Sequence, residues 1–144
     1  AIWHSGPLSA AKQAALLGLR GIAFSTPSAD ADYDFTIVSE WAEKALTTLL
    51  PHTQLPLVNV NIPDRPQGLA WTRQSFRHYD GQIVPGEDPM GRKHFWFTVI
   101  PIEEIEAGSD RWALGRNMVS MTPLRLDLTD DTLLADAQQR HPLT

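Results

Sequence analysis

The sequence predicts an α/β fold that carries a long antiparallel β-hairpin. Two short apolar runs, Gly21–Ser25 and Leu57–Ile62, have the composition of buried strands. Between them, residues 35–50 carry an apolar stripe at helical spacing, which predicts a helix. After Pro63 the sequence changes to aromatic and β-branched runs around a Gly/Pro-rich segment, which is typical of a hairpin.

Composition limits the size of the fold and the kind of partner. The chain has 144 residues, of which 42% are hydrophobic, enough for one core and too few for two ordinary domains. A net charge of -5 without a dense Lys/Arg run argues against nucleic-acid and membrane partners. The chain contains 0 cysteines, which excludes disulfides and thiolate zinc sites and favours the cytoplasm. The first residues show no signal sequence. Because the chain opens at Ala1 without an initiator methionine, in sequence typical of a folded domain, we interpret it as a fragment.

The first helix is predicted to begin at Ser5, whose hydroxyl can accept hydrogen bonds from first-turn amides. Pro7 suits the first turn, and Gly18 supplies a left-handed residue that ends the helix. Its apolar side is small and consists of Leu8, Ala11 and Ala15. The second helix ends at Pro51, and the second strand ends at Pro63.

The hairpin is predicted from strands over Trp71–Tyr79 and Phe95–Ile100, joined by a loop over Pro85–Gly91. Its large aromatic side chains need a surface to cover them. Stacking on a nucleobase is one possibility, and burial against another subunit is the one we favour.

The carboxyl-terminal part holds one more strand and one more helix. Asn117, a residue that tolerates positive φ, precedes a strand over Met118–Thr122. Thr129, Asp130 and Asp131 are predicted to cap a last helix. We divide the chain into a core over residues 1–63 and an arm with an oligomerisation segment over residues 64–144.

Six short segments occur in the order found in one known family. They are Trp3-His4-Ser5-Gly6, Gly21-Ile22-Ala23-Phe24-Ser25, Leu57-Val58-Asn59-Val60-Asn61-Ile62-Pro63, Thr72-Arg73-Gln74-Ser75, Asp88-Pro89-Met90-Gly91-Arg92 and Val119-Ser120-Met121-Thr122-Pro123-Leu124. From Ala1 to about Thr132 the chain resembles the carboxyl-terminal part of the SurE family.

The resemblance implies a partial Rossmann-like fold with three layers, α/β/α, in a metal-dependent 5′-nucleotidase acting on nucleoside monophosphates. It implies a divalent cation, Mn2+ or Mg2+, whose ligands lie upstream of this chain. It places the phosphate beside Ser5 and Gly6 and assigns no catalytic residue and no metal ligand here. Pro7 stands where the family has threonine and contributes neither an amide nor a hydroxyl. A homodimer or homotetramer formed through the hairpin arm is expected.

Several alternatives stay open from the residues alone. Ser5 and Gly6 can act as a helix cap without a ligand, and His4 is more often structural than catalytic. Asp30, Asp32 and Asp34 have the spacing of a calcium loop, but Phe35 stands where that loop needs glycine, so we expect a solvated loop. Asn59 and Asn61 lie at a strand end where α/β sites gather, or they hydrogen-bond to neighbouring loops.

Two further hypotheses concern the chain as a whole. It is either part of the enzyme or an inactive assembly module whose arms exchange between subunits, and a truncated reading frame is a third possibility. If a neighbouring strand lies upstream, Gly21–Ser25 becomes an exposed edge and the chain is expected to oligomerise or aggregate.

Overall fold

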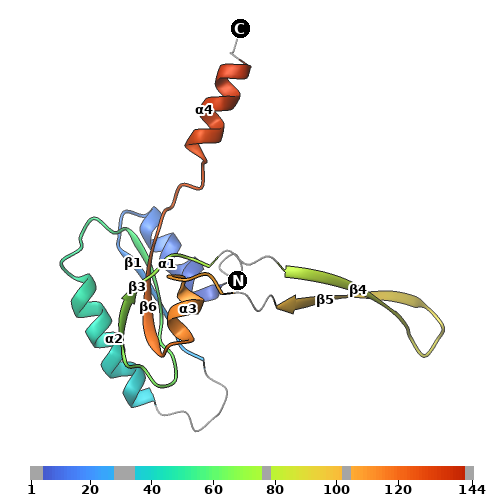
Figure 1. Ribbon diagram of the computed structural model, residues 1–144, viewed down its shortest axis with the longest axis horizontal. Coiled ribbons are helices and arrows are strands. Elements are labelled where there is room, and N and C mark those ends of the chain that lie inside the picture. Colours follow the sequence, from blue (N-terminus) through green and yellow to red (C-terminus); the bar gives the residue numbers. More distant parts are fainter. Residues whose placement is uncertain (1–4, 28–34, 76–78, 102–104, 142–144) are drawn as a thin grey trace.

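Four strands form one mixed sheet in the order β1-β2-β6-β3. The computed structural model describes residues 5–27, 35–75, 79–101 and 105–141 (Figure 1). Strand β1 (Gly21–Ser25) is parallel to β2 (Leu57–Asn61). Strand β6 (Met118–Leu124) is antiparallel to β2 and parallel to β3 (Gly68–Trp71).

Helices α1 (Gly6–Leu16) and α2 (Phe35–Leu49) cover opposite faces of this sheet. Successive residues of a strand point to opposite faces, so Leu57 packs toward α1 and Val58 toward α2. The predicted α/β fold with three layers is therefore confirmed. Among the described residues, no helix is long and apolar enough to cross a membrane.

The helix ends agree with the predicted signals and add one that the sequence did not reveal. Ser5 caps α1, and Gly18 follows it with a φ of 82°. Arg20 caps α2 from outside: its guanidinium donates to the carbonyls of Leu49 at 2.8 Å and Leu50 at 3.3 Å. Because the last carbonyls of a helix lack partners within the helix, this side chain anchors the end of α2 beside β1.

The predicted first strand of the hairpin is wrong. The hairpin consists of β4 (Tyr79–Glu87) and β5 (Lys93–Pro101), whereas Trp71 ends β3 in the main sheet. Of the run that suggested a single hairpin strand, Trp71 thus ends a strand of the core and Tyr79 begins β4. Residues 76–78 lie outside the described part of the chain.

The predicted loop over Pro85–Gly91 is also too long, because Pro85 pairs with Phe95 and Gly86 with His94. A proline is tolerated in an edge strand, where its missing N–H group need not face a partner. The turn is held by the Asp88 carboxylate, which accepts from the amides of Met90 and Arg92, both at 2.9 Å.

The carboxyl-terminal strand and last helix are found where they were predicted, except that β6 extends two residues past Thr122 to Leu124. Asn117 has a φ of 56°, and β6 follows it. Helix α4 (Asp131–Arg140) is capped by Asp130, buries no residue, and stands away from the body in Figure 1. A short helix, α3 (Asp110–Leu114), was not predicted.

The sheet takes strands from both sides of residue 63, and the division there into two parts stays a prediction. Within the residues that the structure describes, β1 forms one edge of the sheet, and an exposed strand edge can pair with another chain.

Candidate functional site

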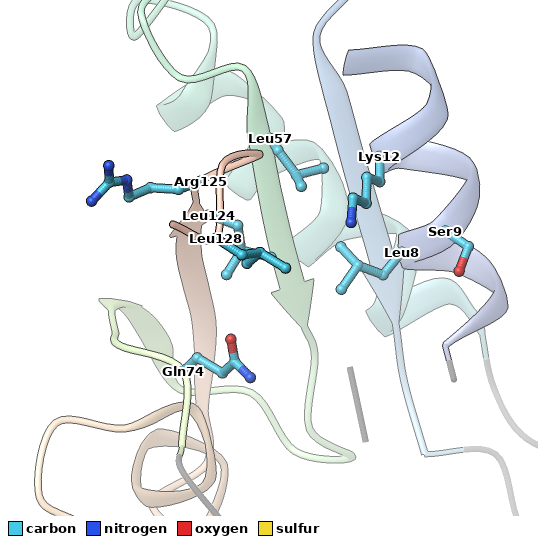
Figure 2. Close-up of a pocket in the computed structure, with 8 residues that line it drawn as sticks. All are labelled: Leu8, Ser9, Lys12, Leu57, Gln74, Leu124, Arg125 and Leu128. Carbon is cyan, nitrogen blue, oxygen red and sulfur yellow. The ribbon is translucent and has the colours of Figure 1, made fainter. Parts of the chain in front are cut away.

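The first turn of α1 lies at the carboxyl-terminal edge of β1 and β2. Helix α1 reaches β1 through a short turn and therefore runs antiparallel to it, which brings the start of the helix to the end of the strand. Figure 2 shows Leu8 and Ser9 of this turn facing the cavity that Leu57 of β2 also lines. Ligands of α/β proteins gather at this edge of the sheet.

Ser5 organises the first turn of the helix. Its Oγ accepts from the amide of Leu8 at 3.3 Å, and its carbonyl accepts from the amide of Ser9 at 2.9 Å and from the Ser9 hydroxyl at 2.7 Å. The Ser5 hydroxyl thus keeps its own proton to donate. Pro7 has no N–H group, and no partner of the Gly6 amide is found among the described residues. One amide and one hydroxyl are available to an anion, fewer than a helix start without proline offers.

Beside this turn, the face of the sheet that α1 covers is polar. Asn59 lies opposite Thr122 across the β2-β6 ladder, and Asn61 lies opposite Ser120. The Asn61 amide donates to Ser120 Oγ at 3.2 Å, and the hydroxyls of Thr122 and Thr72 are 2.7 Å apart. We call Asn59, Asn61, Thr72, Ser120 and Thr122 the polar floor; all but Asn61 are buried.

Farther along the same face, a cavity of about 120 Å³ opens between α1, β2 and β6 (Figure 2). Leu8, Leu57, Leu124 and Leu128 form its apolar side. The Lys12 side chain points toward these leucines in the picture, whereas Arg125 points away. The cavity continues the apolar half of the α1 face and adds no charged cluster to the site.

Metal ligands are not supplied by the part of the chain that the structure describes, where no group of three His, Asp or Glu side chains could hold a cation. His4, Asp30, Asp32 and Asp34 lie outside the described residues. The described residues alone therefore do not fit a divalent cation. The site formed by Ser5, Gly6 and the polar floor offers neutral hydrogen-bonding groups and a helix start.

The sequence pointed to Ser5, Gly6, Asn59 and Asn61, and it missed the hydroxyls of Thr72, Ser120 and Thr122. A signal was present, because polar and apolar residues alternate in Val119-Ser120-Met121-Thr122 just as they do in Val58-Asn59-Val60-Asn61. That alternation in strands covered on both sides marks one polar face.

Comparison with known proteins gives consistent matches. The family model described as Survival protein SurE matches residues 1–81. The 5′-nucleotidase SurE 1 of Thermus thermophilus is 41% identical over 130 residues, covering 88% of this chain and 51% of that protein. The 5′-nucleotidase SurE of Geobacter metallireducens is 36% identical over 138 residues, covering 90% of this chain and 54% of that protein.

The fold is also similar to a solved structure, the SurE protein from Aquifex aeolicus. The TM-score is 0.82 at 29% sequence identity, with 96% of this chain and 58% of that chain covered. The chain spans about half the length of the curated relatives it matches.

Proposed function

Because the chain belongs to the SurE family, we propose that it forms the phosphate-binding half of a cytoplasmic, metal-dependent 5′-nucleotidase that hydrolyses nucleoside monophosphates. The observation that carries the proposal is the capped start of α1 at the carboxyl-terminal edge of β1 and β2, next to the polar floor. Relatives that are named 5′-nucleotidases match most of this chain.

The chain's own residues hold the phosphate in this proposal. The Ser5 hydroxyl and the Gly6 amide donate to phosphoryl oxygens, and the positive end of the α1 dipole favours the negative charge. Both donors are fixed in place by the helix cap, so they need little reorganisation when charge develops on the phosphoryl group.

A divalent cation, Mn2+ or Mg2+, would supply the activation of water and the neutralisation of phosphoryl charge. The described residues do not fit such an ion. On the resemblance to the SurE family, we assign its ligands to a segment upstream of this chain, and Ser5 and Gly6 have phosphate binding alone.

Titration of the 15N-labelled chain with inorganic phosphate tests the site. We expect the largest amide shifts at Gly6 and Leu8, and the Ser5→Ala variant should bind phosphate about tenfold more weakly, the effect of one charge-assisted hydrogen bond. Ser39→Ala is the matched control, because the Ser39 hydroxyl donates to the carbonyl of Phe35 in its own helix, α2. Shifts that avoid Gly6 would contradict the proposal.

A second assay tests where the metal ligands lie. AMP and p-nitrophenyl phosphate are incubated with the folded chain in the presence of Mn2+ and then of a chelator. Ligands outside the chain predict no turnover. Chelator-sensitive turnover would show that residues of this chain bind the metal and would overturn that assignment.

The hairpin favours a second candidate role, in assembly. Phe95, Trp96 and Phe97 are exposed and point to both faces of a two-stranded hairpin, which is marginally stable alone in water. We propose that the arm joins subunits into a homodimer or homotetramer. Light scattering should show an oligomer that Phe95→Ser with Phe97→Ser dissociates, whereas Met90→Ser in the turn should not. A monomeric wild-type chain would contradict this role.

A further inference from the structure

The polar floor has hydrogen-bonding capacity that the described part of the protein does not use. Asn59 is only 8% exposed, and no hydrogen bond to its side-chain amide is found among the described residues. A polar group that is buried without a partner costs free energy, so nearly all such groups are hydrogen-bonded. Among the described residues, the one side-chain atom found fully buried without a partner is Arg20 Nε. The Asn59 amide therefore reaches the surface of this face, where a ligand can bind to it.

The neighbours of Asn59 also have hydrogen-bond donors and acceptors for which no partner is found among the described residues. Asn61 uses its Nδ2 to donate to Ser120 Oγ at 3.2 Å, which leaves the Asn61 Oδ1 as an acceptor and the Ser120 hydroxyl proton as a donor. The Thr72 and Thr122 hydroxyls satisfy one another at 2.7 Å and hold β3 beside β6. The unused groups therefore include donors and acceptors within one small area.

This area lies level with the start of α1. A Cβ on Gly21 would collide with the Ala11 carbonyl, so Ala11 sits directly over the first residue of β1. From Ala11 back to Ser5 the helix advances about 9 Å. Along β1, Ala23 and Ser25 lie about 7 Å and about 13 Å from Gly21.

Ala23 pairs with Asn59, and Ser25 pairs with Asn61. Ser5 therefore stands level with the stretch between the two asparagines, one strand to the side. A ligand whose phosphate contacts Ser5 would extend over the polar floor.

The chemistry of the floor selects the part of the ligand that lies there. Its five residues are neutral, with no Lys or Arg among them. A phosphate only accepts hydrogen bonds, and the unused Asn61 Oδ1 would repel it. A side-chain amide both donates and accepts hydrogen bonds, and so does a hydroxyl group, so hydroxyl groups can pair with both atoms of the amide.

We propose that Asn59 and Asn61 bind the sugar hydroxyls of a sugar phosphate whose phosphate lies at Ser5 and Gly6. The inference rests on the proposed function for the position of the phosphate. It makes the polar floor the element that distinguishes sugar phosphates from simple phosphate esters.

Two ligands test separately the proposed phosphate site at Ser5 and Gly6 and the proposed sugar site at Asn59 and Asn61. The 15N-labelled chain is titrated with inorganic phosphate and with ribose 5-phosphate, both with Mg2+, while the Gly6 backbone amide and the side-chain amides of Asn59 and Asn61 are followed. We expect both ligands to shift Gly6 and only ribose 5-phosphate to shift the asparagine side chains. Asn59→Ala should weaken the binding of ribose 5-phosphate about tenfold and leave the binding of inorganic phosphate unchanged. Ser5→Ala should weaken the binding of both ligands.

Each result supports or overturns one claim. If phosphate shifts Gly6 but ribose 5-phosphate leaves both asparagine side chains unmoved, the inference fails and the proposed phosphate site stands. If neither ligand shifts Gly6, the phosphate site fails and the inference fails with it. The wild-type side-chain shifts decide the matter even where Asn59→Ala does not fold, and Asn59→Ser, which keeps a smaller polar group, serves as a second variant.

Discussion

The two faces of the main sheet differ although the same strands build both. The face toward α2 is apolar and joins Val58, Val60, Ile62, Val119 and Met121 to Ala45 and Leu49 of the helix. The face toward α1 is apolar only at one end, around Leu57, and the polar floor occupies the other end. The face toward α2 thus forms the apolar core that stabilises the fold. The face toward α1 has fewer apolar contacts at the end where a ligand is proposed to bind.

The largest expected effect lies on the α2 face. Leu49→Ala should lower the free energy of unfolding by about 3 kcal/mol, because Leu49 is 0% exposed and its truncation leaves a cavity. Leu50→Ala is the matched control: Leu50 is 57% exposed, and its truncation should change stability by less than about 0.5 kcal/mol. Urea unfolding of both variants measures the difference. Equal losses would mean that the α2 face does not carry the core.

The next effect concerns the contact of α1 with its face. Gly21→Ala would place a Cβ against the backbone carbonyl of Ala11, so α1 must move away, at a cost of about 2 kcal/mol. At Gly115 the backbone is helical and the nearest atom to an added Cβ is 3.5 Å away, so Gly115→Ala should be close to neutral. Thermal unfolding compares the two. A neutral Gly21→Ala would contradict the close packing of α1.

A smaller effect tests whether the polar floor is structural in part. Thr122→Val leaves the buried Thr72 hydroxyl without its partner and should cost about 1 to 2 kcal/mol. The double variant Thr72→Val with Thr122→Val should be more stable than the sum of the single effects predicts, because both hydroxyls are then absent. Strict additivity in the double-mutant cycle would show that the two hydroxyls do not interact.

The smallest effect is a pH dependence of the hairpin turn. The backbone amide of Arg92, followed by its guanidinium, hydrogen-bonds to Asp88 and lowers the pKa of this carboxyl below its ordinary value. Because the folded-state pKa of Asp88 is lower than its unfolded-state pKa, the ionised carboxylate stabilises the turn at pH values above the unfolded-state pKa, about 4. This stabilisation is lost as the pH falls through the lower, folded-state pKa. An NMR titration of the Asp88 carboxyl measures the midpoint. Arg92→Gln should raise it, and an unchanged midpoint would contradict the contribution of the guanidinium.

Local signals were sufficient where an element needed only its own residues. Ser5, Gly18, Asn117 and Asp130 each act through backbone geometry or capping within a few residues, and each was predicted correctly. Pairing between distant segments was harder. The strand from Gly68 to Trp71 was missed because it is short and its partner, β6, lies about 50 residues further on, so composition alone did not distinguish it from the hairpin.

The candidate site shows the same division. The sequence placed Ser5 and Gly6 at a helix start and Asn59 and Asn61 at a strand end. It did not bring Ser120, Thr122 and Thr72 beside them, because that requires the antiparallel pairing of β2 with β6 and the parallel pairing of β6 with β3.

By itself, then, the sequence determined the α/β class, the caps, the two central strands and the resemblance to one family, since these depend on periodicity, on single residues with special backbone preferences and on short colinear motifs. Only the tertiary structure decided which strands pair, that one face of the sheet is apolar and the other partly polar, and that Asn59 belongs to the polar part of that face. Those properties arise from contacts between residues far apart in the chain, and strand register, which sets every side chain's face, is fixed only when the whole sheet has formed.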